Sequence, residues 1–363
     1  MNVVIATTGT GGDLFPGVAV AEALRKKQGV SVRFVVSGLG QEEEVLRSHR
    51  FSFDRLHVGR LKGESKWSRS KTLFGLPLTI ARSGLLLKRV QADVVLGSGG
   101  HTSGPMLLAA CLLRLPRAIM EPNTRPGLTN RILALLVSRI YTGFPGSEYR
   151  FPKQKALGTG VPIRPDLSAL PLKTGRDFTV LVLGGSRGAV RLNTILLETV
   201  PHLARSGRKV RILHQTGRVD FERARGLYDR LGALREWVDL FPFRADIRKE
   251  YAEADLVIAR AGASTIAELT ALGKPAILIP YPFAADDHQT ANASWFVEQG
   301  GGEVILEKDL DHDAGKKIAD RILYYERNGE ALKMISDKIG RLKRGNAAEE
   351  IAVDLIRLAR GRG

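Results

Sequence analysis

Short runs of β-branched and aliphatic residues alternate with amphipathic segments along this chain of 363 residues. Such alternation is typical of βα units wound on a parallel sheet and predicts an α/β protein. The predicted strands of the first half are residues 3–7, 31–36, 93–96, 117–120 and 139–141. Helices are predicted to begin near Pro16, Gln41, Ser103 and Gly127. The predicted strands of the second half are residues 178–183, 209–214, 238–241, 256–259 and 275–280.

The segment 164–175 is rich in proline and polar residues, which is typical of a linker between domains. We therefore predict two doubly wound, Rossmann-like domains, residues 1–165 and residues 166–345. The apolar spacing of Ile351, Leu355 and Leu358 predicts a helix over about 346–363, which we expect to pack back on the first domain. Because such sheets bind ligands beyond the carboxyl ends of their strands, two domains facing across a cleft would let two substrates meet.

Basic residues are concentrated in the first half of the chain. Residues 1–165 carry 24 Lys and Arg against 10 Asp and Glu, a net charge of +14, whereas the remaining 198 residues carry +3. An anionic partner that meets only this half, either phosphate-rich or a membrane surface, would explain the distribution. Solubility or general affinity for nucleic acid would give the same charge. The apolar runs are too short to span a membrane, and the single cysteine excludes an intramolecular disulfide.

Four glycine clusters follow predicted strands. They cover residues 9–13, 97–101, 184–188 and 260–265. Because glycine has no Cβ, the backbone N–H groups of such loops can approach an anion or a sugar closely, above all where a helix begins. The alternative is that the glycines only permit tight turns between strand and helix. Four clusters at strand ends favour binding.

Two familiar motifs fail in this sequence, and a third matches. A dinucleotide fingerprint would need glycine where Leu14 stands, and a P-loop would need Ser or Thr at Pro275. Residues 184–188 match the Gly-x-Ser-x-Gly elbow of serine hydrolases, for which His288 or His312 would have to complete a triad. No His/Cys cluster has metal-ligand spacing, and the acids of residues 309–313 are interpreted as opening a helix.

Residues 260–292 carry the most specific signal. A helix N-terminus at residues 263–265 offers amides to a diphosphate, and Glu268, one turn further, can accept hydrogen bonds from a ribose diol. His288 and Gln289 open the next predicted helix and can bind sugar hydroxyls. Taken singly, Glu268 could equally be a solvated or capping acid and Gln289 a surface amide. Their combination at this spacing favours a nucleotide-sugar site.

With these residues the sequence resembles nucleotide-sugar glycosyltransferases that have two Rossmann-like domains (the GT-B fold). It resembles more closely the glycosyltransferase family 28 enzymes of peptidoglycan synthesis. The likeness runs from Thr8 to Asn292 and includes residues 99–105, 121–130, 160–164 and 184–189. It implies an inverting transfer of N-acetylglucosamine from UDP-GlcNAc to the 4-hydroxyl of lipid-linked N-acetylmuramyl-pentapeptide, converting lipid I into lipid II. It also implies no required cofactor or metal, and a peripheral position on the cytoplasmic face of the bacterial inner membrane.

The resemblance assigns donor-binding roles by position. Ser186 would lie near a phosphate, Arg164 near the nucleotide, Glu268 at the ribose and Gln289 at the N-acetylglucosamine. The other implied donor contacts are Thr10, Gly11, Gly12, Asn123, Arg244, Ala263, Ser264, Thr265, Ile266 and Ala267. At Arg244 the family usually has an aliphatic residue whose backbone binds uracil.

The main departure from the family concerns the catalytic base, because Asp13 stands where a histidine is usual. An aspartate can take the hydroxyl proton if partial desolvation raises its pKa. The alternative is that Asp13 only caps the following helix. His101 and Glu121 are alternative bases, although His101 could instead pack against the acceptor. The implied acceptor loop consists of Gly99, Gly100, His101 and Thr102.

Residues 62–90 combine basic with aromatic and aliphatic side chains, which suits an anionic membrane surface. The proposed membrane patch is Lys66, Trp67, Arg69, Lys71, Phe74 and Arg82. An ordinary helix with a buried apolar stripe is the alternative. Three rival functions remain: a transferase for another glycolipid, sterol or natural product, which Asp13 favours; a nucleotide-sugar 2-epimerase; and a nucleic-acid-binding protein. The aromatic residues, 6% of the chain and scattered, argue against a nucleic-acid partner.

Overall fold

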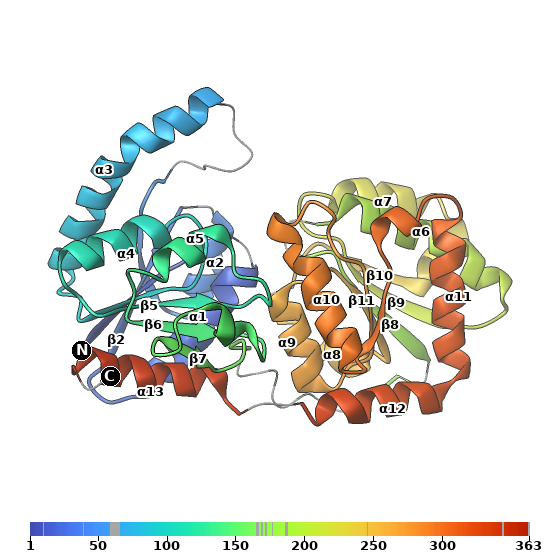
Figure 1. Cartoon of the computed structure of the whole chain (residues 1–363). Helices are drawn as coiled ribbons and strands as arrows, with labels where there is room; N and C mark the ends of the chain where they lie inside the picture. Colours follow the sequence, from blue (N-terminus) through green and yellow to red (C-terminus); the bar gives the residue numbers. More distant parts are fainter. Residues whose placement is uncertain are drawn as a thin grey trace. The chain divides into compact units, whose positions relative to one another are not determined.

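A computed structural model describes residues 1–9, 11–38, 40–58, 66–164, 167, 170, 173–175, 177–185, 188–244, 246–342 and 345–361, without the side chains of residues 11, 41 and 66–74. The chain divides into two compact units. The first unit consists of Met1–Arg164 together with the segment from Gly345 onward, and the second of Pro165–Arg344. Each unit is a parallel sheet with helices on both faces (Figure 1), which confirms the predicted α/β fold class.

In the described part of the first unit, seven parallel strands lie in the order β3-β2-β1-β4-β5-β6-β7. Their bounds are β1 Asn2–Ala6, β2 Ser31–Val36, β3 Ser52–Arg55, β4 Val94–Gly97, β5 Arg117–Glu121, β6 Arg139–Thr142 and β7 Ala156–Gly158. The central strand β1 pairs with β2 on one side and with β4 on the other, with Val3 opposite Val32 and Val94.

Alternate side chains of these strands enter two separate cores. Val3 and Ile5 point to one face and pack under α1 (Gly11–Arg25), α2 (Gly40–Ser48) and α13 (Ala347–Ala359). Val4 and Ala6 point to the other face and pack under α3 (Lys66–Arg89), α4 (Ser103–Leu112) and α5 (Leu128–Leu133). Because side chains alternate along a strand, β1 contributes residues to the cores on both faces of the sheet.

In the described part of the second unit, six parallel strands lie in the order β10-β9-β8-β11-β12-β13. Their bounds are β8 Phe178–Leu183, β9 Val210–Gln215, β10 Val238–Phe241, β11 Leu256–Ala259, β12 Ala276–Leu278 and β13 Gly302–Val304. The core on one face includes side chains of α6 (Val190–Arg205), α7 (Phe221–Asp229) and α11 (Ala314–Arg327). The remaining helices are α8 (Arg248–Glu253), α9 (Ala263–Leu272), α10 (His288–Glu298) and α12 (Gly329–Gly340), and Figure 1 shows α8, α9 and α10 on the opposite face.

The strand order reverses once in each sheet. From β1 the first sheet grows through β2 to β3, and the chain then returns to place β4 on the other side of β1. The second sheet does the same, with β9 on one side of β8 and β11 on the other. At such switch points the two loops that leave the carboxyl ends diverge and open a crevice. The described residues of the four glycine clusters lie at these two places.

One helix start differs from its prediction. We expected a helix to begin near Pro16, but α1 begins at Gly11 and contains Pro16 in its second turn. The glycine cluster therefore supplies the first residues of the helix, and Asp13 lies in the first turn. The missing N–H of Pro16 costs one intrahelical hydrogen bond, which the packing of α1 in the core outweighs.

Candidate active site

Hydroxyl groups join the loops that follow β1 and β4 at the switch point of the first sheet. The Oγ1 atoms of Thr8 and Thr102 lie 2.5 Å apart, and the Thr102 backbone N–H donates to Thr8 Oγ1 at 3.0 Å. Thr102 Oγ1 also donates to the carbonyl of Thr7 at 2.8 Å. Both threonine side chains are buried. The predicted acceptor loop is therefore fixed directly against the first glycine cluster.

Asp13 lies half-buried in this place, packed on the backbone of Gly99. A Cβ atom built on Gly99 would lie 2.3 Å from Asp13 Oδ1, and the backbone of Gly99 has a φ of +132°. Ser98 Oγ donates to the main-chain carbonyl of Asp13 at 2.8 Å. Burial, followed by the negative charge of Glu121, raises the pKa of Asp13 to about 7. A carboxyl group with this pKa can accept and release protons at neutral pH.

Glu121 ends β5 and organises the loop that follows it. Its Oε1 accepts from the backbone N–H and the side-chain amide of Asn123, at 3.0 and 3.1 Å. Its Oε2 accepts from Gly127 N at 3.1 Å and from Asn130 Nδ2 at 2.9 Å. Burial still raises the pKa of Glu121 despite these bonds. Because both carboxylate oxygens are already occupied, the geometry favours Asp13 over Glu121 as the base.

The other two residues of the acceptor loop lie in the tight turn between β4 and α4. Gly100 has a φ of +77°, and a Cβ there would lie 2.4 Å from the Cβ of Thr8. His101 follows it, half-buried. The glycines at 99 and 100 are therefore required by close approach of two loops, and they bring His101 into the same switch point as Asp13.

A buried carboxylate that the sequence analysis missed also holds the first glycine cluster. Glu42 in α2 is fully buried and accepts from the backbone N–H of Gly9. It accepts as well from Ser37 N at 3.0 Å and Ser37 Oγ at 2.9 Å. Glu42 is one of three consecutive glutamates, and the sequence shows no feature that separates it from its exposed or ion-paired neighbours.

The loops that the sequence predicts to bind the donor lie at the switch point of the second sheet. Helix α9 begins after Gly262, so the backbone N–H groups of its first turn point out of the carboxyl end of β11. Glu268 lies in the second turn, and its Oε2 accepts from the hydroxyl of the fully buried Tyr251 at 2.8 Å. This anchor fixes the carboxylate that the sequence analysis assigns to the ribose.

Gln289 lies in the first turn of α10. Its Oε1 accepts from the backbone N–H of Tyr281 at 2.9 Å, and Asn292 Nδ2, further along α10, donates to the carbonyl of Ala261 at 3.3 Å. The second bond ties α10 to the loop before α9. Just ahead of α10, Asp286 and Asp287 both have left-handed φ values, 53° and 52°.

The backbone N–H of Arg244, which the resemblance assigns to uracil, already has a partner within the protein. Its N–H donates to Gln215 Oε1 at 3.2 Å, and its guanidinium pairs with the buried Glu250 and lies 4.2 Å from the ring centre of Phe241. Only the carbonyl of Arg244 would thus serve the predicted role. In the first unit, the buried Arg164 places its guanidinium 4.8 Å from the ring centre of Phe15.

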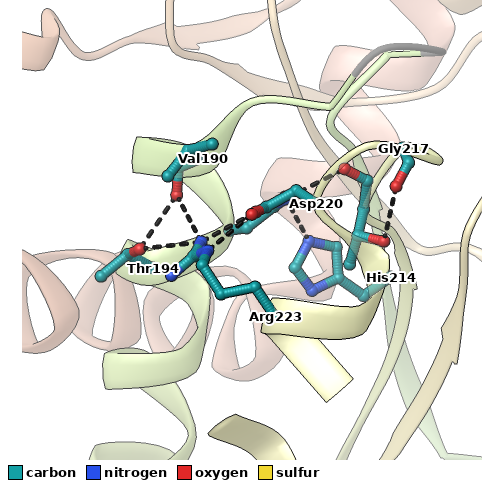
Figure 2. Close-up of polar contacts among 8 residues, drawn as sticks. Val190, Thr194, His214, Gly217, Asp220 and Arg223 are labelled. Carbon is teal, nitrogen blue, oxygen red and sulfur yellow. Dashed lines mark hydrogen bonds and ion pairs between the residues drawn. The ribbon is translucent and has the colours of Figure 1, made fainter. Parts of the chain in front are cut away.

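A polar network joins α6, the end of β9 and the start of α7 in the second unit. Asn193 Nδ2 donates to the carbonyl of Thr216 at 3.0 Å and to Asp220 Oδ2 at 2.7 Å, and its Oδ1 lies 3.0 Å from His214 Nε2. Arg223 clamps Asp220 with two bonds, and Figure 2 shows its guanidinium beside Asp220 and Thr194, with the ring of His214 on the other side. Burial lowers the pKa of His214 to about 3, so the ring is neutral.

Several predicted residues lie outside the described part of the chain. Thr10 and Ser186 are among them, as are the side chains of Lys66, Trp67, Arg69, Lys71 and Phe74; the backbone of these five belongs to α3. Arg82 is exposed. In the part of the chain that is described, no group of three or more His, Cys, Asp or Glu residues is placed to hold a metal ion. Asp313 occupies the N-cap position of α11.

Paired glycine loops at the switch points of two parallel sheets, with Glu268 held one turn beyond the donor-side loop, define the class of nucleotide-sugar-binding proteins with two Rossmann-like units. The glycosyltransferase family 28 N-terminal domain model matches residues 3–142, and the C-terminal domain model matches residues 179–352. The chain belongs to glycosyltransferase family 28. This membership leaves the serine-hydrolase interpretation of residues 184–188 without support.

Individual relatives agree with the family models. The UDP-N-acetylglucosamine–N-acetylmuramyl-(pentapeptide) pyrophosphoryl-undecaprenol N-acetylglucosamine transferase of Syntrophus aciditrophicus (strain SB) is 40% identical over 99% of both chains. Among solved structures, Acinetobacter baumannii MurG is 28% identical, with a TM-score of 0.74 over 98% of this chain and 100% of that one. The UDP-GlcNAc 2-epimerase of Neisseria meningitidis, 15% identical with a TM-score of 0.69 over 98% and 100%, shares the fold alone.

Proposed function

We propose that the protein transfers N-acetylglucosamine from UDP-GlcNAc to the 4-hydroxyl of undecaprenyl-diphosphate-linked N-acetylmuramyl-pentapeptide, the step that converts lipid I into lipid II. The observation that carries this proposal is the 40% identity, over the full length of both chains, to a relative named for that transfer. The half-buried Asp13, with its pKa near 7, supplies the acid–base group that such a transfer needs.

The reaction is a direct displacement at the anomeric carbon. The 4-hydroxyl oxygen of the acceptor forms a bond to C1 of N-acetylglucosamine, and the bond from C1 to the diphosphate oxygen breaks, with inversion. The carboxylate of Asp13 takes the hydroxyl proton, and UDP leaves with the electron pair. Burial keeps Asp13 basic enough for this step, because its raised pKa lies close to neutral pH.

We propose that the donor is held by groups in the loops at the carboxyl ends of strands. Glu268 accepts from the ribose hydroxyls, and Gln289 donates its amide N–H to the sugar. The N-terminus of α9, with Ser186 and Arg164, stabilises the negative charge of the departing diphosphate.

Because these groups stabilise the diphosphate, we expect turnover to be independent of divalent metal. Transfer measured in excess chelator tests this.

The lipid-linked acceptor requires contact with the membrane, and we propose that the basic first unit makes it on the cytoplasmic face of the inner membrane. No helix in the described part of the chain is both long and apolar enough to span a bilayer. Exposed apolar side chains occur instead on three neighbouring elements (Figure 1), α3, α4 and α5 with the turn after it: Leu78, Leu85, Leu112, Leu128, Ile132 and Leu135. Together with Arg82 they suit an interfacial anchor.

A transferase for another glycolipid, sterol or natural product is the second candidate. One feature favours it: Asp13 stands at the position where the resemblance to the family leads us to expect a histidine. The donor site would be the same in both cases. The acceptor therefore has to be tested directly.

The test is transfer of labelled N-acetylglucosamine from UDP-GlcNAc to a short-chain lipid-linked muramyl pentapeptide. Wild type is compared with Glu268→Ala, for which we expect donor affinity to fall at least about tenfold, since a charged hydrogen bond to the ribose is lost. Wild type that binds UDP-GlcNAc but leaves this acceptor untouched would point to the second candidate. Wild type that binds no UDP-GlcNAc would contradict both.

A further inference from the structure

An exposed pair of aromatic rings lies on the loop between β12 and α10. Phe283 is 80% exposed and Tyr281 is 44% exposed. Their ring centres are 5.7 Å apart, with the planes inclined at 70°. Burying the apolar surface of such a ring against another group would be favourable. The pair therefore offers a surface on which a ligand can pack.

Contacts with Arg260 hold the loop that carries these rings. Arg260 Nη1 donates to the carbonyls of Ile279 and Pro280, both at 3.1 Å, and its guanidinium lies 5.6 Å from the ring centre of Tyr281. Glu307 pairs with the same guanidinium at 2.5 Å. A surface that is already ordered loses little conformational entropy when a ligand binds to it.

The rings adjoin a group suited to sugar recognition. The N–H of Tyr281 fixes Gln289 Oε1, which leaves the NH₂ end of that amide as the donor. A pyranose ring presents a face of C–H groups, which packs on an aromatic ring, and an edge of hydroxyl groups, which accept from an amide. An aromatic ring next to an oriented carboxamide matches both parts of that chemistry.

The position and charge of the loop argue against other occupants. It leaves the carboxyl end of β12, beside β11 and the loop that leads into α9, where ligands of such sheets bind. A lipid surface is disfavoured, since residues beyond 165 carry a net charge of only +3, against +14 for the first half. One pair of rings is also far smaller than the area that a stable protein interface buries.

We propose that Phe283, backed by Tyr281, is a stacking platform for a pyranose ring bound at this site. The inference rests on the proposed function and deepens it by naming a specificity-determining residue that hydrogen bonding does not reveal. The ring is either the N-acetylglucosamine of the donor or a sugar of the acceptor. These two sources share the same chemistry and differ in the substrate whose affinity depends on Phe283.

The experiment measures binding of UDP-GlcNAc and of UDP by titration calorimetry, together with the KM for the lipid-linked acceptor. The variants are Phe283→Ala, Phe283→Tyr and, as a matched control, Tyr149→Ala, which removes a ring that is 75% exposed in the first unit. If the ring stacks on the donor sugar, Phe283→Ala weakens UDP-GlcNAc about fivefold and leaves UDP unchanged. If it stacks on the acceptor, both affinities stay the same and the acceptor KM rises about fivefold.

In either case Phe283→Tyr keeps wild-type values, because it keeps the ring, and Tyr149→Ala changes nothing. The inference is overturned if Phe283→Ala leaves all three quantities unchanged, or if UDP and UDP-GlcNAc weaken equally, which would indicate a distorted loop. A change in sedimentation coefficient with unchanged sugar binding would assign the rings to a protein contact and also overturn it. Failure of wild type to use the muramyl acceptor would contradict the proposed function, yet leave the donor-binding comparison intact.

Discussion

At the scale of single residues, the candidate base depends on a glycine that belongs to another loop. Asp13 is half-buried because the backbone of Gly99 packs directly on its carboxyl group. The same enclosure, with Glu121 nearby, raises its pKa to about 7. The raised pKa of Asp13 is therefore a property of two loops and not of one side chain.

The first residue-scale prediction concerns pH. Asp13 acts as a base only when ionised, and its pKa lies near 7, so kcat/KM rises through that pH and levels off above it. Asp13→Asn, which cannot accept the proton, loses about a hundredfold or more in kcat while donor affinity stays constant. Initial rates between pH 5.5 and 9 check both statements. Full activity of Asp13→Asn would move the base to His101 or Glu121.

The second residue-scale prediction concerns Gly99. Gly99→Ala would place a Cβ 2.3 Å from Asp13 Oδ1 on a backbone with a φ of +132°, so the variant either displaces the carboxyl group or strains the loop. We expect at least a tenfold loss of kcat. Gly104→Ala is the matched control, since no atom lies within 4 Å of the Cβ it would add, in the first turn of α4. Steady-state rates and melting temperatures of both variants test this, and equal effects would refute it.

The sequence points to candidate residues of this site but not to their partners. The family resemblance singles out Asp13, because a histidine is usual at that position, and Glu268 is singled out by its spacing after a glycine cluster. The bonds that make Glu121 a loop anchor, and the ion pair that occupies the Arg244 guanidinium, join residues from separate segments. Glu42 was missed altogether, because only its burial against Gly9 distinguishes it from adjacent glutamates.

At the scale of elements, the network of Figure 2, which joins α6, the end of β9 and the start of α7, makes the second unit sensitive to acid. Burial holds the pKa of His214 at about 3, whereas an unfolded histidine has a pKa of about 6.5. The unfolded chain thus binds more protons between these values, and the stability contributed by neutral His214 is lost as pH falls below 6.5. We expect a loss of about 2 kcal/mol between pH 6.5 and 5. Urea unfolding of wild type and His214→Gln checks this, since the variant lacks that slope.

A second element-scale prediction concerns the docking of α13. Asp354 Oδ2 accepts from the Tyr141 hydroxyl and from Arg139 Nε, both at 2.9 Å, and all three side chains are largely buried. Asp354→Ala leaves two buried donors without this partner and should cost about 2 kcal/mol. Glu349→Ala on the same helix, which breaks a more exposed pair with Lys27, should cost less than about 0.5 kcal/mol. Chemical denaturation compares them, and similar losses would contradict the assignment.

Strands could be predicted from the sequence where they consist of a run of buried apolar residues. β2, β8, β10 and β11 have the bounds that the sequence predicts, because three or more of their residues are apolar and flanked by polar turns. β3, β7 and β13 were not predicted. Each has three or four residues, lies at or next to a sheet edge and is largely half-buried or exposed, so no hydrophobic run marks it.

At the scale of the whole molecule, the two units differ in charge, and this difference predicts which one meets the membrane. Binding to vesicles containing phosphatidylglycerol should weaken about tenfold between 50 and 300 mM salt and be much weaker for purely zwitterionic vesicles. Leu135→Ser should reduce binding, and Val219→Ser, at an equally exposed apolar residue of the second unit, should not. Vesicle co-sedimentation measures both. Equal effects would remove the first unit as the docking surface.

The return of the chain to its first unit has a consequence for biosynthesis. Ile351, Ala352 and Leu355 of α13 are fully buried against α1 in the core that also holds β1. During synthesis the first unit therefore lacks part of its core until α13, residues 347–359, has left the ribosome. The second unit, continuous in sequence, has no such delay. Nascent chains should accordingly complete the second unit before the first, and a chain that stops before residue 347 should hold one folded unit beside an incomplete one.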